Sequence, residues 1–190
     1  MDFKSTPQNG NSYLHVWDVS TVKVYDGGFL LTKSNLPVGL KELPKATFLK
    51  VDLEERTAKA IKTVSLFEAI TAASTEVKIK KGSLLVKNDV IGTGSKTVTV
   101  GDIDTSDAEY DSFAITADAL GELEINATLQ EFASGKPVNP DGFNYTDVKI
   151  DAQPSVSVVF KVYGVVSERL PFPITDEIID SLKLCQILKK

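Results

Sequence analysis

The sequence contains one histidine, one cysteine, one methionine and one tryptophan among 190 residues. A structural zinc site needs about four cysteine or histidine ligands, so His15 and Cys185 alone exclude such a site. A single cysteine also excludes a disulfide within the chain. A Ser-His-Asp or Cys-His catalytic site would depend entirely on His15. We therefore predict a protein that is not an enzyme and that has no catalytic residue, cofactor or metal.

The chain also lacks a long apolar run and a concentrated group of basic residues. No stretch approaches the roughly 20 apolar residues of a membrane span, and the polar start has no apolar signal core. The formal net charge is -5, from 21 basic and 26 acidic residues, and the basic residues are scattered. Nucleic-acid-binding proteins usually gather theirs on one face. We expect neither a membrane nor a nucleic-acid partner, and synthesis in a reducing cytoplasm.

What is present is an ordinary globular composition, 42% hydrophobic and 25% charged. A chain of this length buries roughly 70% of its unfolded surface, enough for a core without metals or disulfides. Short apolar segments separated by turn residues predict strands. The expected strands are 48–51, 57–67, 77–79, 84–86, 97–100, 112–116, 123–132 and 156–166. Short strands at close spacing favour a mainly β, compact barrel-like or clip-like fold over a long-stranded sandwich.

The N-terminal part is predicted to be an appendage. A polar arm, residues 1–11, precedes two β-rich segments on either side of Asp26-Gly27-Gly28, which predicts a hairpin. Aromatic residues gather here: Phe3, Tyr13, Trp17, Tyr25 and Phe29. We expect Trp17 and Phe29 to pack in the core and the arm to reach a neighbouring subunit. The predicted division is an arm and hairpin, residues 1–40, and a β-rich domain, residues 41–190.

The C-terminal part differs from the rest because it predicts a helix. Thr175 can cap a helix over residues 175–184, and Asp176 and Glu177 then occupy its first turn, where the helix dipole favours acids. Residues 186–188 predict a final strand. A single helical turn is also expected at residues 68–73.

Two segments resemble each other. Residues 43–52 align without gaps to residues 79–88, and a Lys-Thr-Val sequence follows each copy. The alternative is chance similarity between short lysine-rich strands. We interpret the repeat as two copies of a bent β-unit packed against each other. The small residue, Ala46 or Gly82, then sits where the chain turns into a strand.

Two further segments have the appearance of binding motifs. Five carboxylates within residues 102–111 supply oxygen ligands of the kind that calcium prefers, but the central glycine and the final glutamate of an EF-hand are missing. We favour a solvated acidic loop, which can also meet a basic surface on a partner.

Residues 92–97, GTGSKT, resemble a phosphate-binding loop, but its first glycine is missing and Gly94 and Lys96 are not adjacent. We predict a β-turn there.

The single histidine and the single cysteine are both interpreted as structural residues without a chemical role. His15 lies in an alternating segment beside Val16 and Trp17, which favours a strand residue over a ligand or base. Cys185 is expected on the apolar face of the last helix, which favours a small core residue over a nucleophile.

The segment Lys80-Lys81-Gly82-Ser83-Leu84-Leu85 resembles the K-x-G-T-x-L element of phage head decoration proteins. Residues 141–148, followed by the valine-rich residues 156–166 and Leu170, are similar to a second element of that family and the strand after it. The helix and closing strand of residues 173–188 are similar too. The resemblance covers roughly residues 41–190. The sequence departs from the family in having Ala46 where glycine is typical, and residues 1–37 have no counterpart.

The resemblance implies a β-clip-like or β-tulip-like domain that forms homotrimers. It implies a structural virion protein, made in the bacterial host cytoplasm, that binds the major capsid protein on the outside of a phage capsid and reinforces it without catalysis. Two other classes stay open. One is a small-ligand or carbohydrate-binding β-domain of a bacterial cell or phage fibre, and the other is a small hydrolase or lyase that depends on carboxylates alone.

Overall fold

The computed structural model describes residues 15–189 and is mainly β, with 39% of residues in strands and 7% in helices. The predicted β class is therefore confirmed. The strands of the described residues close no barrel, and the β-clip or β-tulip architecture stays a prediction.

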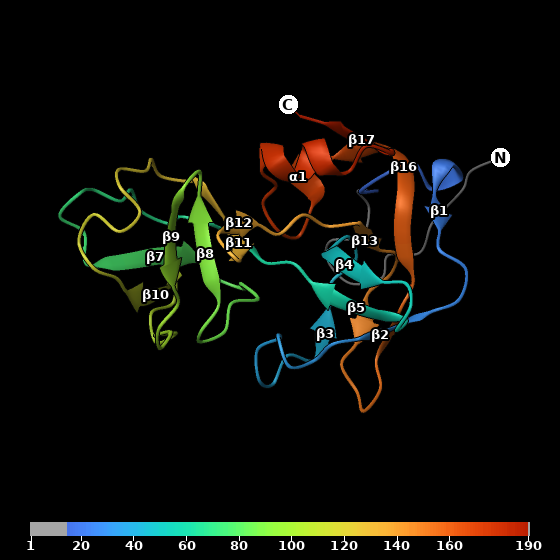
Figure 1. Cartoon of the computed structure of the whole chain (residues 1–190), viewed down its shortest axis with the longest axis horizontal. Helices are drawn as coiled ribbons and strands as arrows, with labels where there is room; N and C mark the ends of the chain where they lie inside the picture. Colours follow the sequence, from blue (N-terminus) through green and yellow to red (C-terminus); the bar gives the residue numbers. More distant parts are fainter. Residues whose placement is uncertain (1–14, 190) are drawn as a thin grey trace.

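Two lobes lie side by side (Figure 1), each around its own apolar cluster. We define the first lobe as residues 15–62 and 138–189, and the second lobe as residues 63–137. Phe48 and Phe143 are buried in the first cluster, and Phe113 and Leu129 in the second. The second lobe is thus an insertion within the sequence of the first, and the chain crosses between the lobes twice.

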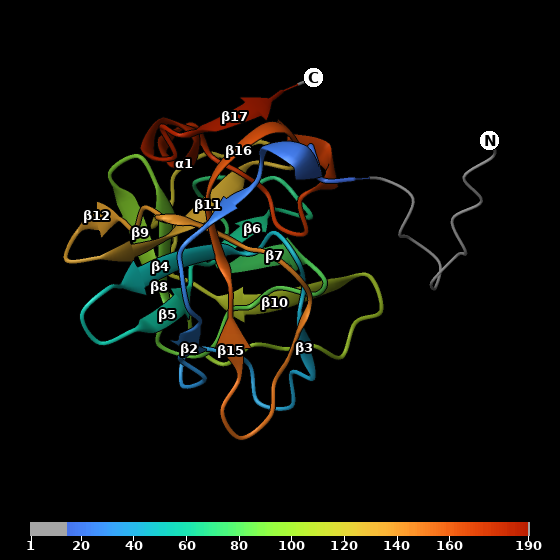
Figure 2. The ribbon, with the colours of Figure 1, turned by 90° about the vertical axis from the view of Figure 1, so that its right-hand side faces the viewer.

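The first lobe is built on an eight-stranded sheet in the order β1-β16-β13-β4-β5-β2-β15, with β17 also paired to β16. Its strands are β1 (Lys23–Val24), β2 (Phe29–Leu31), β4 (Phe48–Asp52), β5 (Thr57–Ala60), β13 (Gly142–Asn144), β15 (Ser155–Val156), β16 (Val158–Val166) and β17 (Cys185–Leu188). Around the sheet lie the strand pair β3 (Glu42–Leu43) and β14 (Val148–Lys149), two 3-10 turns, η1 (Val19–Thr21) and η2 (Ser167–Arg169), and helix α1 (Asp176–Ser181). Figure 2 shows β17 and α1 at one end of the molecule.

Strand β13 lies in the middle of this sheet, between β16 and β4. A Cβ atom at Gly142 would lie 2.1 Å from the backbone oxygen of Val159, so only glycine allows the two strands to approach this closely. The next residue, Phe143, is fully buried, and its ring lies 5.8 Å from Trp17 and 5.6 Å from Phe48. The centre of the first core is therefore aromatic, as expected for Trp17 and Phe29, which are both buried.

The second lobe holds a five-stranded sheet and a strand pair. Its strands are β6 (Thr63–Ser65), β7 (Glu76–Lys80), β8 (Val90–Thr93), β9 (Lys96–Thr99), β10 (Tyr110–Ala114), β11 (Thr128–Ala133) and β12 (Lys136–Pro137). Strands β8 and β9 form a hairpin in which Thr93 pairs with Lys96, and Gly94 turns the chain with a φ of 58°. The segment that resembles a phosphate-binding loop is thus a β-turn, as predicted.

Several predicted elements are confirmed. Strands β4, β7, β9 and β10 occupy the predicted segments, and β17 is the predicted final strand. The helix is shorter than predicted, but Thr175 caps it, because its hydroxyl accepts a hydrogen bond from the Ile178 amide at 3.2 Å. The segment 123–132 forms a strand only from Thr128, and the valine-rich segment is divided into β15 and β16.

The predicted N-terminal hairpin is wrong. Strand β1 pairs with β16, while β2 pairs with β5 and β15, so the two strands do not pair with each other. The Arg56 guanidinium donates to the carbonyls of Asp26 and Gly28, and this contact holds the glycine turn against the sheet.

Residues 1–14, with the predicted arm, Phe3 and Tyr13, lie outside the described residues. The boundary between the two apolar clusters does not fall at residue 40, where the sequence placed the end of the appendage. Buried residues from 17 to 36 belong to the first cluster together with residues of β13, β15 and β16.

The predicted strand 57–67 is two strands. Strand β5 ends at Ala60 in the first lobe, β6 begins at Thr63 in the second, and Ile61 and Lys62 cross between the sheets. Residues 84–86 form no strand, since Leu84 is buried in the first cluster and Leu85 in the second. The expected helical turn at 68–73 is also wrong, because this segment is a bend held by the pairing of Ile70 with Leu123.

The two copies of the internal repeat share one backbone feature. Ala46 has a φ of 65° and Gly82 a φ of 83°, so both small residues adopt the left-handed conformation. In the first copy the chain then enters β4, as predicted. In the second copy it continues without a strand, because its apolar residues are shared between the two lobes.

Candidate functional site: the cleft between the lobes

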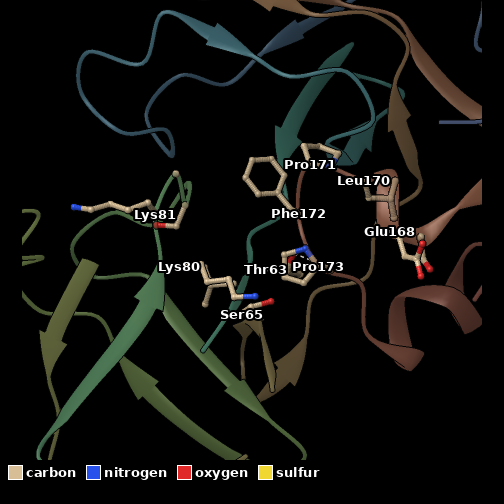
Figure 3. Close-up of a pocket in the computed structure, with 13 residues that line it drawn as sticks. Thr63, Ser65, Lys80, Lys81, Glu168, Leu170, Pro171, Phe172 and Pro173 are labelled. Atoms are coloured by element: carbon tan, nitrogen blue, oxygen red, sulfur yellow. Dashed lines mark hydrogen bonds between the residues drawn. The ribbon is translucent and has the colours of Figure 1, made fainter. Parts of the chain in front are cut away.

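A cleft of about 450 Å³ lies between the two lobes, within the size range of ligand sites. The second lobe lines it with the start of β6 and the turn after β7, and the first lobe lines it with η2 and the proline-rich segment that follows. The residues are Thr63, Val64, Ser65, Lys80, Lys81, Gly82, Ser83, Ser167, Glu168, Leu170, Pro171, Phe172 and Pro173. Figure 3 shows the two walls facing each other.

Two adjacent lysines on the second-lobe wall point in different directions. Lys81 extends away from the cleft (Figure 3), and its ammonium donates to Asp111 at 2.7 Å and to the Thr105 carbonyl at 2.8 Å. Lys80 extends toward Ser65 on the neighbouring strand (Figure 3). Its ammonium has no ion pair or hydrogen bond with any residue from 15 to 189. Lys80 is the last residue of β7, and Lys81 begins the turn after it, where Asp111 and the Thr105 carbonyl hold its ammonium away from the cleft.

The first-lobe wall is rigid. Pro171 and Pro173 fix the backbone around Phe172, whose ring is only 8% exposed. The Thr63 hydroxyl donates to the Pro173 carbonyl at 2.6 Å, which ties this segment to the second lobe. The wall therefore offers an apolar strip, residues 170–172, beside the polar side chains of Ser167 and Glu168.

A buried charged group holds the lobes together close to the cleft. The Lys62 side chain is fully buried, and its ammonium donates to Asp89 at 2.5 Å. The Lys62 backbone amide donates to Glu131 at 3.1 Å, and the other carboxylate oxygen of Glu131 accepts from Lys59 at 2.6 Å. These contacts join residues on the first-lobe side of the crossing to carboxylates of the second lobe.

Burial lowers the pKa of Lys62 from its ordinary value, and the hydrogen bond and charge of Asp89 oppose that shift. A second contact, from the Thr175 hydroxyl to the Gln130 side-chain oxygen at 2.5 Å, joins the helix cap to β11. The Gln130 amide in turn donates to the Val138 carbonyl at 2.9 Å. Four separate segments thus meet at the junction through hydrogen bonds, so the junction fixes the relative position of the two cleft walls.

The chemistry of the cleft suits binding. Its ionisable residues are two lysines and Glu168, and the rest of the lining is hydroxyl, backbone and apolar surface. Within residues 15–189 no three His, Cys, Asp or Glu side chains come together in a way that could hold a metal ion.

The acidic segment 102–111 does not converge on one point. Asp102 pairs with Lys87 at 2.7 Å and Asp111 with Lys81, on different sides of the loop. Hydrogen bonds from Ser106 hold the pKa of Asp104 below its ordinary value. Asp102 and Asp111 are thus occupied by lysines, and Asp104 and Asp107 by backbone amides of the loop itself, which agrees with the predicted solvated loop.

His15 is exposed, and its backbone carbonyl accepts a hydrogen bond from Arg169 at 2.9 Å. His15 lies outside the described strands, so its predicted strand position is wrong. Cys185 begins β17 and does not extend the helix; it is partly buried, and its thiol lies 3.6 Å from the Phe160 carbonyl. Neither residue lines the interlobe cleft.

Burial raises the pKa of the Cys185 thiol to about 11. Between pH 9 and 11 the unfolded chain releases this proton and the folded chain keeps it, so stability should fall as the pH rises. Because the thiol is only partly buried, we expect wild type to lose about 1 kcal/mol more than Cys185→Ser across this interval. Urea unfolding of both proteins at pH 8, 9.5 and 11 measures this difference in the free energy of unfolding. Lys62 is present in both proteins, so its titration does not contribute to the difference. Parallel stability profiles would show that the thiol is not held protonated.

No helix of the described residues is long and apolar enough to span a membrane; α1 has six residues. Comparison of the chain with known protein families, curated proteins and solved structures finds no match.

Proposed function

We propose that the protein is a structural virion protein that binds the outer surface of a phage capsid and reinforces it without catalysis. The observation that carries the proposal is the position of residues 80–85, the segment that resembles decoration proteins. Its exposed turn, Lys81 and Gly82, stands at the cleft, and its two leucines enter the cores of different lobes. The segment is thus both accessible and rigidly supported, which suits a contact that must carry load.

The mechanism is bridging. Many copies of a two-lobed protein can connect neighbouring subunits of the major capsid protein, so modest contacts add up through multivalency. The buried Lys62–Asp89 pair supports this role because it keeps the lobes in a fixed relation. The protein acts on the capsid surface after synthesis in the host cytoplasm.

The exposed apolar residues support self-association, and the family resemblance implies that the oligomer is a homotrimer. Five of the nine large apolar side chains that remain exposed lie on or beside β1, β16 and β17, which are neighbours in the first-lobe sheet. These residues are Val19, Val24, Tyr163, Leu184 and Leu188. Apolar surface gathered in this way is typical of protein contacts.

The test combines solution mass with capsid binding. Light scattering behind size exclusion should give about three times 20.6 kDa, and the protein should co-sediment with capsids assembled from the major capsid protein of the same genome. A Tyr163→Glu and Leu188→Glu double variant should be a monomer, because two charges enter the apolar surface. Ile125→Glu, at a 56% exposed position of the second lobe, is the matched control and should stay a trimer. A monomer that never sediments with the capsid would contradict the proposal.

The cleft itself favours a second candidate, a small-ligand or carbohydrate-binding domain of a cell or phage fibre. Its volume and its serine and threonine hydroxyls support this candidate. Sugar sites, however, usually present the face of an aromatic ring, and the aromatic residue of this cleft, Phe172, is almost fully buried. Binding of a glycan in an array screen, with no capsid binding, would favour the second candidate.

A further inference from the structure

The second lobe contains many more acidic than basic residues: twelve carboxylates and six lysines fall within residues 63–137. Four of these lysines are paired with a carboxylate of the same lobe. The pairs are Lys78–Glu68, Lys81–Asp111 and Lys87–Asp102, each at 2.7 Å, and Lys96–Asp118 at 3.1 Å. Lys80 and Lys136 have no ion pair within residues 15–189, and only Lys80 lines the cleft. The Lys80 ammonium at the cleft is therefore free to pair with an anionic group of a ligand, although the surplus of carboxylates in this lobe opposes the approach of small free anions.

The groups around Lys80 extend this anion site into a longer surface. The hydroxyls of Ser65 and Ser83 stand on the same wall and make no side-chain hydrogen bond to residues 15–189. On the opposite wall, Ser167 and Glu168 supply acceptors, and the strip of residues 170–172 supplies apolar contact through Leu170 and Pro171, since Phe172 is almost fully buried. A ligand that fits must therefore carry an anionic group, hydrogen-bond donors and an apolar part.

We propose that the interlobe cleft binds an extended peptide segment of a partner protein. An acidic side chain of the peptide pairs with Lys80, its backbone amides donate to Ser167 and Glu168, and an apolar side chain lies against residues 170–172. A polypeptide supplies all three features along one strand, whereas an uncharged sugar leaves Lys80 unpaired. The inference rests on the proposed function only in taking the partner to be a protein.

The experiment uses a yeast-displayed library of random 12-residue peptides, selected against the full chain. The selected peptides should contain aspartate or glutamate beside an apolar residue. Fluorescence anisotropy with the synthetic peptides should show that Lys80→Gln weakens binding at least tenfold, since a charge-assisted hydrogen bond is lost. Lys87→Gln removes the same charge from the same lobe at a position outside the cleft, and it should change affinity less than twofold.

A charge exchange gives a second readout. Lys80→Glu should bind a peptide whose acidic residue is replaced by lysine, and it should reject the original peptide. Selected peptides without acidic residues, equal binding by Lys80→Gln, or a failed charge exchange would each overturn the proposal. A glycan that binds the cleft without dependence on Lys80 would overturn it as well. Peptide binding with no capsid binding would contradict the proposed function and leave the peptide site standing.

Discussion

Replacing Lys62 with alanine is expected to lower the free energy of unfolding by about 3–5 kcal/mol, the usual loss when one partner of a buried ion pair is removed. The side chain is fully buried, so the variant leaves Asp89 without its cation and opens a cavity between the lobes. Asp89 is itself only 13% exposed and cannot regain full hydration without movement. Urea denaturation followed by circular dichroism measures the loss.

The matched control is Lys59→Ala. Lys59 pairs with Glu131 in the same junction, but its own side chain is 45% exposed, and Glu131, although only 6% exposed, keeps the hydrogen bond from the Lys62 amide. We therefore expect a smaller loss, about 1–2 kcal/mol. Equal losses for the two variants would show that burial of the Lys62 charge does not stabilise the junction. The lobes would then be held mainly by their backbone and apolar contacts.

Phe143→Ala should be as destabilising as Lys62→Ala, but through the loss of apolar packing. The ring is fully buried between Trp17 and Phe48 in a central strand, and truncating such a residue costs about 3–5 kcal/mol. Leu53→Ala is the control in the same lobe, because Leu53 is 55% exposed and its loss should stay within about 0.5 kcal/mol.

Tryptophan fluorescence in the same denaturation series reports on the first lobe by itself. The emission of Trp17 follows unfolding of the first lobe, because this tryptophan lies in the first cluster. A Phe143→Ala protein that unfolds at the wild-type urea concentration would show that the aromatic centre is not the main support of the first core.

The sequence predicted those elements whose pattern is local. Strand β7 alternates in hydrophobicity, β4 and β9 are short segments rich in β-forming residues, and the helix has its cap and acidic first turn within three residues. The hairpin prediction failed because β1 and β2 pair with strands more than 100 residues away, β16 and β15. The end of one strand and the start of the next around Ile61 and Lys62 could not be predicted. A strand that passes from one sheet to another can keep the same sequence of apolar and polar residues.

The candidate site was only partly visible. The segment 80–83 belongs to the predicted family resemblance, but its meeting with residues 170–173 across a cleft depends on the second lobe folding as an insertion. The burial of Lys62 could not be predicted from the sequence, because a lysine beside Thr63 and Val64 is typical of an exposed strand residue. Its burial follows from the meeting of two sheets at the crossing, which is a property of the tertiary structure.

The insertion of the second lobe also sets the order in which the protein is made. All strands of the second lobe lie between Thr63 and Pro137, so this lobe is complete while β13, β15, β16 and β17 are still being synthesised. The first lobe must wait for these late strands, because β16 supplies the partner for β1. During translation β1 therefore stays unpaired, and the edges of β4 and β2 that later pair with β13 and β15 stay open, so chaperones have a window in which to protect them.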